Sequence, residues 1–508
     1  YCEPVNDERK MGTQRFGAGK DWKGQASIFV RLKSLGVCAS VLRGRAGLIA
    51  LCAGWLLSLG VLRAADFADP LEERDFKAAA RAFQDLNYEW AEREFGEFAR
   101  NWKDSAFKGE AILRQAQARY HLANYPGALN LLTTGLPQAG GLADRYQFWL
   151  GETHFQVGNL DKAASTYALL CRDFTNSPHF LAAAHNEALA RFRLGQHTNV
   201  VALLRLPAGS FQRAAKASPT NSLVVSGTLL LGEALLTTRD YPAAELAARS
   251  LDDRRLEPEL DWQRRFLLGR VLAGAGHTAE ALPVATNLVR LASALKQPLL
   301  QAESYSLQGA VLEKLGELAA AAASFTNNFT TNAPPELRRR ALLKAVELTL
   351  AQTNHEPAVV AMLEEFSARH PADPSLDFAQ LTLGEMRVKE FHGLAAGTNG
   401  PAQTNLLAAA LTNLTFVLTR HTNSPFVKWA HYQRGWCHWH QDRFAEAAVD
   451  FSEAARRLPQ AEEQAIARFK LGEAQMRLKD YTNAIQSFGR VVTDYAGFER
   501  VRTTYFDQ

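Results

Sequence analysis

The sequence predicts an all-α protein, a right-handed α-α superhelix in which about eleven helix-turn-helix repeats stack into a solenoid. Two observations predict this fold class. An alanine recurs at a nearly fixed interval of 37 residues, and a glycine or alanine usually stands twelve residues before it. Periods of about 20–50 residues are typical of stacked helical units that share one continuous core.

The recurring alanine marks the second helix of each unit. The aligned positions are Ala91, Ala128, Ala163, Val200, Ala244, Ala281, Ala321, Ala358, Ala410, Ala447 and Ala484. Six of the ten intervals between them are 37 residues, so the pattern is a true period and not an effect of composition. A large apolar residue usually follows four positions later, as Phe488 follows Ala484.

The small residue twelve positions earlier marks the first helix. It is found at Ala79, Ala116, Gly151, Ala188, Gly232, Gly269, Gly309, Gly435 and Gly472. A glycine inside a helix costs roughly 1 kcal/mol relative to alanine, so its repeated use indicates a packing requirement. We expect this glycine to face the recurring alanine, and the large residue after the alanine to fill the space toward the next unit.

Capping residues mark where the second helices begin. An Asn or Asp stands four residues before the alanine in six units, at Asn87, Asn124, Asn159, Asp240, Asn354 and Asp480. Such side chains accept hydrogen bonds from the free amides of a helix start. Pro126, Pro242 and Pro357 fall in the first turn, where proline is tolerated.

This pattern resembles the tetratricopeptide repeat family. Gly435, Ala447, Phe451, Ala454 and Pro459 fall at the spacing of the family's signature small, bulky and terminal residues, and the resemblance covers roughly residues 76–500. The resemblance implies a protein that binds protein or peptide partners without catalysis. The long units and the N-terminal segment are similar to exported, envelope-associated bacterial members of the family.

Two departures from the period affect the organisation of the array. Gly384 and Ala410 are separated by 26 residues where 12 is usual, which predicts a loop insertion near residues 393–406. The array spans residues 66–508, and the key glycine of its next repeat is expected near position 509. The sequence therefore stops inside a first helix, and we expect that the C-terminus of the array is truncated.

The N-terminal segment predicts export. An uncharged run from Ala46 to Leu62 follows Arg43 and Arg45 and leads into small residues, which is typical of a signal peptide at residues 41–65. Residues 1–40 are then an untranslated or disordered leader. Export places the protein in the periplasm or cell envelope. The alternative is an uncleaved N-terminal segment that anchors it in the inner membrane.

The charge distribution argues against nucleic-acid binding. The whole chain carries 57 basic and 53 acidic side chains, and ten of the basic and four of the acidic ones lie in residues 1–65. The remainder therefore has 47 basic and 49 acidic side chains, dispersed and not in blocks. A near-neutral body offers no field to attract a polyanion.

The sequence indicates no catalytic site, cofactor or metal site. It has no Gly-rich phosphate loop, GxSxG or HExxH motif. The alternative is a ligand-binding or enzymatic site near residues 429–440, where Cys437 lies among histidines and tryptophans. However, Cys437, His438 and His440 do not all share one helix face, because Cys437 and His438 are adjacent and only residues three or four apart do.

The first helices are expected to line the concave wall of the array and to hold a partner segment there. The predicted partner-binding residues are Phe148, Glu152, Phe155, Tyr432, Trp436, Trp439 and His440. Aromatic side chains dominate many protein interfaces, although large aromatics also fill cores, and that second interpretation stays open. The predicted function is a non-catalytic scaffold of the bacterial cell envelope. The alternative is a self-associating structural subunit, a homo-oligomer.

Overall fold

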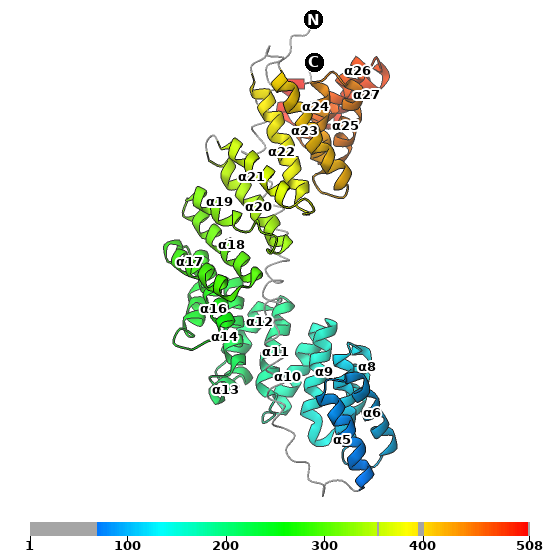
Figure 1. Ribbon diagram of the computed structural model, residues 1–508, viewed down its shortest axis with the longest axis vertical. Helices are drawn as coiled ribbons and strands as arrows, with labels where there is room; N and C mark the ends of the chain where they lie inside the picture. The colour runs from blue at the N-terminus through cyan, green and yellow to red at the C-terminus, as the bar shows by residue number, and fades with distance from the viewer. Residues whose placement is uncertain (1–68, 353–354, 395–400, 506–508) are drawn as a thin grey trace. The chain divides into compact units, whose positions relative to one another are not determined.

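The computed structural model describes residues 69–352, 355–394 and 401–505, and over these ranges it consists of helices and turns without a strand (Figure 1). The chain divides into two compact units, one ending at Leu291 and the other beginning at Ala292. The predicted leader and signal peptide, residues 1–65, lie outside the described residues. Within the ranges that are described, no helix combines the length and apolar character that a membrane span requires.

The N-terminal unit contains the helices from α5 to the first part of α17. They are α5 (Pro70–Gln84), α6 (Tyr88–Asn101), α7 (Lys108–His121), α8 (Tyr125–Gly135), α9 (Ala143–Val157), α10 (Leu160–Asp173), α11 (Phe180–Arg193), α12 (His197–Arg205), α13 (Ser210–Ala217), α14 (Ser222–Thr237), α15 (Tyr241–Arg249), α16 (Pro258–Ala275) and α17 (Thr278–Leu295), with short 3-10 turns η2 (Leu136–Gln138) and η3 (Gly140–Leu142). α17 contains the boundary between the two units.

The C-terminal unit contains the helices that follow. They are α18 (Pro298–Lys314), α19 (Leu318–Thr326), α20 (Pro335–Leu350), α21 (Glu356–Arg369), α22 (Leu376–Gly393), α23 (Pro401–Arg420), α24 (Val427–Trp439), α25 (Phe444–Arg457), α26 (Glu462–Arg477), α27 (Tyr481–Asp494) and α28 (Glu499–Tyr505). Residues 395–400, between α22 and α23, are not described.

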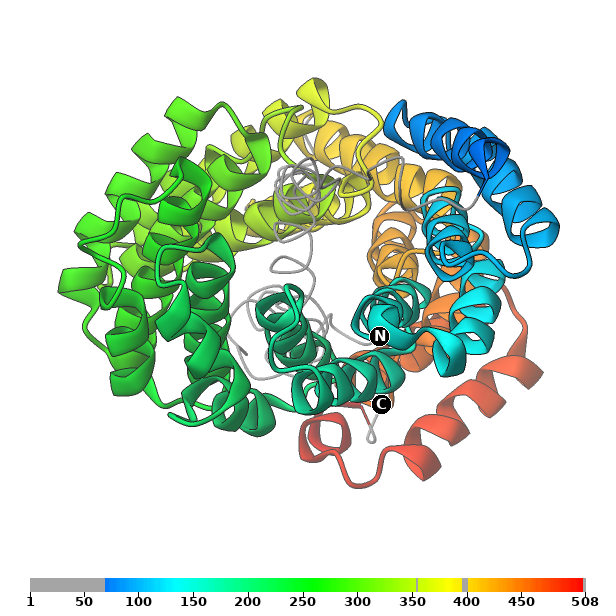
Figure 2. The same ribbon diagram turned by 90° about the horizontal axis from the view of Figure 1, so that it is seen from below.

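Consecutive helices alternate between two layers in each unit (Figures 1 and 2). Most helices pack on their neighbours in sequence, and first helices also contact one another, as α7 contacts α9 and α22 contacts α24. A helix with one apolar stripe buries it against the next pair, so apolar clusters follow one another along each array, as around Phe95, Tyr146 and Tyr167. The predicted fold class, an all-α solenoid of helix pairs, is confirmed.

The aligned position of the second helix is buried in every helix-turn-helix repeat, once the register of one repeat is corrected. Ten of the eleven aligned residues are at most 2% exposed, whereas Ala358 is exposed and Val359 is fully buried in its place. Second helices such as α6 and α25 begin three residues before the buried position, and α21 begins at Glu356. The alignment on Ala358 was therefore wrong by one residue.

The glycine of the first helix makes room for an aromatic ring. A Cβ built on Gly435 would lie 2.9 Å from Cδ1 of Phe451, and one built on Gly151 would lie 2.6 Å from Cε1 of Tyr167. The large residue thus packs on the glycine of its own unit. We expected the alanine to occupy that place and the ring to point toward the next unit, which is wrong for these two pairs.

The predicted caps are largely confirmed. The side chains of Asn87, Asn124, Asp240 and Asp480 each accept a hydrogen bond from a backbone amide in the first turn of α6, α8, α15 and α27. Asn159 occupies the N-cap position of α10 but makes no such bond. Asn354 lies outside the described residues.

The insertion predicted near residues 393–406 lies largely in two extended helices. α22 continues to Gly393, well past Gly384, and α23 begins at Pro401, well before Ala410. Residues 401–406 are therefore helical, and the prediction of a loop is wrong for them. The remainder of that prediction, at residues 395–400, lies outside the described residues.

Candidate partner-binding surface

In the N-terminal unit, the half-buried aromatic side chains of the first helices α7 and α9 include Tyr120, Trp149 and Phe155, which we call the aromatic row. Tyr120 on α7 and Trp149 on α9 contact each other edge to face, with ring centroids 5.3 Å apart. Further along α9, the guanidinium carbon of Arg193 on α11 lies 4.3 Å from the ring centroid of Phe155. These side chains present apolar rings with a positive charge beside them, a combination that is enriched at protein interfaces.

Glu152 lies behind this row and ties three helices together. Its Oε1 accepts hydrogen bonds from the Tyr167 hydroxyl at 2.6 Å and from the Asn186 amide at 2.7 Å. Burial raises the pKa of Glu152, and the hydrogen bonds from Tyr167 and Asn186 lower it only in part. The carboxylate therefore serves as an internal link between α9, α10 and α11.

In the C-terminal unit, a lysine of the same chain lies against the tryptophans of α24. The ammonium nitrogen of Lys470 on α26 is 4.9 Å from the ring centroid of Trp436 and 4.6 Å from that of Trp439. Glu473 balances its charge at 2.8 Å. Because a cation over an indole face is attracted by the ring quadrupole, Lys470 fixes both rings from inside the protein.

His440 extends this aromatic surface toward α22. Its ring stacks on Trp436 with centroids 5.8 Å apart and lies 4.8 Å from the ring of His392. Burial, together with His392 and Lys470, lowers the pKa of His440 to about 3. The imidazole is therefore neutral at pH 7, and its buried Nε2 has no hydrogen-bond partner among the residues that the structure describes.

The seven predicted partner-binding residues divide into two groups. Phe148, Tyr432 and Trp436 are 1%, 7% and 6% exposed, so they belong to the core, which is the second interpretation of the aromatics. Phe148 and Tyr432 each stand three residues before the glycine of their unit, which directs them between packed helices.

The other four residues, Glu152, Phe155, Trp439 and His440, are half-buried, and their partner-binding role stays a prediction. Trp149 and Lys470 were not among the residues predicted to bind a partner. Both stand two residues before a unit glycine, so they share one repeat position that the alignment contained.

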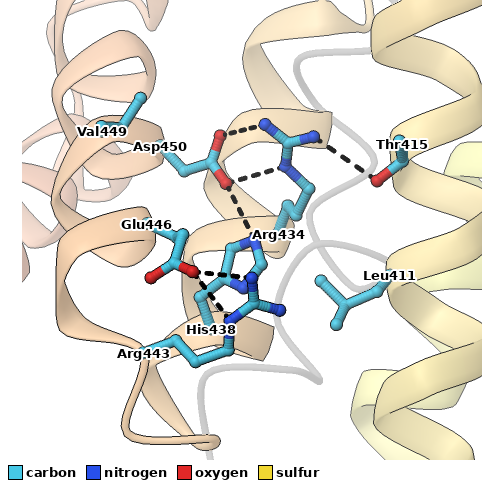
Figure 3. A pocket seen from close by; sticks show the side chains of 8 residues that line it. All are labelled: Leu411, Thr415, Arg434, His438, Arg443, Glu446, Val449 and Asp450. Carbon is cyan, nitrogen blue, oxygen red and sulfur yellow. Dashed lines mark hydrogen bonds and ion pairs between the residues drawn. The ribbon is translucent and has the colours of Figure 1, made fainter.

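A polar pocket of about 430 Å³ lies between α23, α24 and α25 (Figure 3). The aromatic row lies on α7 and α9 of the N-terminal unit, so the pocket is a separate feature. Two of the pocket's walls come from second helices. Its lining residues are Leu411, Thr415, Arg434, His438, Arg443, Glu446, Val449 and Asp450. At its rim, Arg443 forms an ion pair with Glu446 at 2.6 Å.

Asp450 is the centre of the ion pairs in this pocket and is 1% exposed. Arg434 donates from Nε to Oδ2 and from Nη2 to Oδ1, both at 2.8 Å, and Nδ1 of His431 lies 2.7 Å from Oδ1. Burial raises the pKa of Asp450, but hydrogen bonds from His431 and Arg434 outweigh that effect and leave the pKa lowered. Asp450 is therefore an ionised, fully paired carboxylate.

The remaining groups of the 429–440 segment have little chemical reactivity. Burial raises the pKa of the Cys437 thiol to about 12, and Cys437 is fully buried. Only a thiolate is a good nucleophile, so this cysteine is inert at neutral pH. Burial also lowers the pKa of His438, whose Nε2 lies 3.7 Å from Oδ2 of Asp450. In the described ranges, no three His, Cys, Asp or Glu side chains converge to hold a metal ion.

Comparisons with known proteins agree with the helix-pair packing. Two family models, both described as tetratricopeptide repeat, match the chain, one at residues 113–178 and 402–462 and the other at residues 467–497. The matched residues lie in both units and include α9, α10 and α24 to α27. No curated protein matches the sequence.

Three of the solved structures that resemble this chain are similar to it at low sequence identity. A tetratricopeptide repeat protein from Parabacteroides merdae is 14% identical, with 54% of this chain and 98% of that chain covered and a TM-score of 0.39. The structure of Naa15/Naa10 bound to HypK-THB is 14% identical, with 82% and 68% covered and a TM-score of 0.33. The P58(IPK) TPR domain is 14% identical, with 80% and 98% covered and a TM-score of 0.23.

The family assignment depends on the matched repeats and on the helix pairs that continue between them. The glycine and ring pair of the matched unit at Gly435 and Phe451 recurs at Gly309 and Phe325, which no family model matches. The matched segments are therefore tetratricopeptide repeats, and the helix pairs between them pack in the same way.

Proposed function

We propose that this protein is an exported scaffold of the bacterial cell envelope that holds a segment of a partner protein along its first helices. Tetratricopeptide repeats form scaffolds for protein–protein interaction, and that part of the function follows from the family. The observation that carries the proposal further is an aromatic residue four positions after the recurring glycine of the first helix. It is Phe155 in one repeat and Trp439 in another. Both remain half-buried while the rings beside them are in the core.

The mechanism that we propose is binding by a preorganised surface. Arg193 fixes the ring of Phe155, and Lys470 fixes that of Trp439, so little side-chain freedom is lost when a partner binds. Rigid aromatic anchors beside charged side chains suit an extended or helical segment that makes many weak contacts. Export through residues 41–65 supplies the location.

Site-specific photocrosslinking tests the binding surface. We would place p-benzoylphenylalanine at Phe155 or Trp439 of the full chain and irradiate it in a cell-envelope extract of the source organism. The matched control carries the label at Val449, which is 63% exposed on the second helix α25. We expect one partner to be captured from both first-helix positions and not from Val449. Equal capture from all three positions would contradict the proposal.

The location has a test of its own. Sequencing the N-terminus of the protein purified from its source is expected to show a mature chain that begins close to Asp66. A chain that retains residues 41–65 and sediments with membranes would instead support the anchored alternative. A chain that retains them and is found in the cytoplasm would contradict export.

A further inference from the structure

The N-terminal unit contains an apolar groove that is separate from the aromatic row of the first helices. The groove has a volume of about 430 Å³ and is lined by residues of α12, α13, α14 and α15. It lies on the side of α14 that faces the second-helix layer, because its walls come from α12, α13 and α15. The partner surface proposed above is formed by α7, α9 and α11, so the groove is a different site.

The groove exists because the second helices in this region are short. α12 spans only His197–Arg205, and it ends before Pro207, since the residue before a proline avoids helical geometry. α15 spans only Tyr241–Arg249, whereas α10 spans Leu160–Asp173. The layer above α14 is therefore incomplete, and Leu231 of α14 is left only partly covered.

The extra helix α13 forms one wall of this groove. The interval between Val200 and Ala244 is 44 residues where 37 is usual, and α13 lies within it. Phe211 of α13 packs on α14 so closely that a Cβ on Gly227 would lie 2.3 Å from its ring. This contact fixes α13 in place and gives the groove a rigid side.

The opposite wall carries a large apolar side chain that the fold leaves open to solvent. Leu246 of α15 is 71% exposed and borders the groove, while Leu235 of α14 is buried at its floor. The hydroxyls of Thr228 and Ser250, which also line it, already donate to backbone carbonyls of their own helices. The floor is therefore effectively apolar, and it leaves hydrophobic surface exposed to solvent.

All the charged residues that line the groove are cations. They are Arg205, Lys216 and Arg254, and each is exposed. Arg254 donates one hydrogen bond to the carbonyl of Pro219, and Arg205 lies 3.9 Å from Asp240, a pair in which both side chains are about half exposed. Exposed pairs at that distance are weak, so the field at the rim remains positive.

We propose that this groove binds a short amphipathic acidic segment of a partner protein, with apolar side chains on the floor and Asp or Glu side chains beside the three cations. An apolar groove between two helices accepts the apolar face of a helical or extended peptide. Complementary charges at the rim select an acidic sequence and accelerate its association. The apolar face of such a segment matches the exposed floor of the groove, and its negative charge matches the three cations at the rim.

Fluorescence anisotropy with the full chain and two synthetic peptides tests this inference. The first peptide carries Leu and Phe at helical spacing with Glu between them, and the second has Lys in place of every Glu. We expect the acidic peptide to bind and the basic peptide not to bind. We also expect the affinity for the acidic peptide to fall as salt is raised, because exposed charges are screened.

Matched variants locate the binding. Lys216→Glu and Leu246→Ser are each expected to weaken the acidic peptide about tenfold, since like charge or a lost apolar contact opposes the same segment. The controls are Lys162→Glu and Leu169→Ser on α10, both at exposed positions of another second helix, and they are expected to bind like the wild type. All four sites are exposed, so the variants are expected to keep the wild-type thermal unfolding curve.

Three results would overturn the inference. Equal binding of the acidic and basic peptides would show that the groove does not select its ligand by charge. Groove variants that bind as tightly as the α10 controls would place the peptide elsewhere. A mass that rises with concentration in the wild type but not in Leu246→Ser would assign the groove to a second copy of the chain. The crosslinks expected at Phe155 and Trp439 are independent of all three.

Discussion

The ring of Phe451 occupies the space that Gly435 leaves open, so that a Cβ on Gly435 would lie 2.9 Å from both Cδ1 and Cε1 of the ring. The ring is fully buried and also packs edge to face against Trp436. It therefore has no room to move away. The same relationship explains why glycine recurs in the first helices in spite of its low helix propensity.

Replacing Gly435 by alanine is expected to destabilise the protein. The added methyl group gains about 1 kcal/mol of helix propensity but forces a buried ring to shift, so we expect a net loss of about 1–3 kcal/mol in the free energy of unfolding. The matched control is Gly489→Ala on α27, where an added Cβ would meet nothing within 4 Å. That variant is expected to be more stable than the wild type. Urea denaturation of both variants decides the matter, and a stabilised Gly435→Ala would contradict the packing argument.

The register of α21 gives a second test. Val359 is fully buried, so Val359→Ala is expected to cost about 2 kcal/mol through lost burial and a small cavity. Ala358→Ser, one residue away at an exposed position, is expected to change the free energy of unfolding by less than about 0.5 kcal/mol. A larger effect at Ala358 than at Val359 would restore the register that the sequence first indicated. Thermal unfolding of the two variants is sufficient.

Stability is expected to fall as the pH drops below about 6.5, through His440. Its pKa is lowered to about 3 in the folded protein, so the unfolded chain binds a proton between these two pH values and the folded chain does not. The stabilisation is thus complete above the pKa that His440 has in the unfolded chain, and it is lost as the pH falls toward 3. A single group of this kind gives a slope of about 1.4 kcal/mol per pH unit at most.

The measurement is the free energy of unfolding at pH 7.5 and 5.0 for the wild type and for His440→Phe. The variant cannot be protonated at this position, so its stability is expected to depend less on pH. His185 and His438 have lowered pKa values for the same reason, burial, and they keep part of the dependence in the variant. Identical pH profiles for the two proteins would show that His440 is not buried in its neutral form.

Loss of the Asp450 carboxylate is expected to destabilise the C-terminal unit. Asp450→Ala leaves Arg434 and His431 without the acceptor that they share, and breaking a buried pair costs about 3–5 kcal/mol. The double variant Asp450→Leu/Arg434→Met removes both charges and is expected to recover much of the loss. Chemical denaturation of the single and double variants measures the coupling, and additive effects would contradict a shared ion network.

The buried thiols are expected to react only when the protein unfolds. Burial raises the pKa of both Cys171 and Cys437 to about 12, so neither forms a thiolate at neutral pH. A variant with Ser at positions 2, 38 and 52 isolates these two thiols. Its labelling by a disulfide reagent is expected to be slow in buffer and complete in denaturant. Rapid labelling in buffer would revive a nucleophilic role for Cys437.

Much of this fold was predictable because its signals are local. An N-cap such as Asp480 and a glycine such as Gly435 act within one helix pair, and repetition of the pair shows each signal many times. The register failed at Ala358, where small apolar residues are adjacent and Asn354 resembles a cap, whereas the N-cap position of α21 is His355. The helical extension of α22 and α23 was missed because Gly, Asn and Thr between residues 393 and 406 indicate a loop by composition alone.

The candidate surface was only partly predictable. Phe148 and Phe155 lie on one helix and look alike in sequence, yet the first is buried and the second half-buried. Their exposure depends on which neighbouring helix covers each position, and that is a tertiary property. The sandwich of Lys470 with Trp436 and Trp439 joins α26 to α24, so no pattern within either helix shows it.

The period, the caps and the small residues are enough to predict an array of helix pairs, because chain geometry over a few turns sets all three. The packed helices are needed to show which aromatic rings reach solvent, where the Asp450 network closes and where a groove opens between α12, α13 and α15. Those features depend on helix lengths and on contacts between neighbouring helices. Burial and charge pairing are sums over such contacts, so they exist only once the helices are packed together.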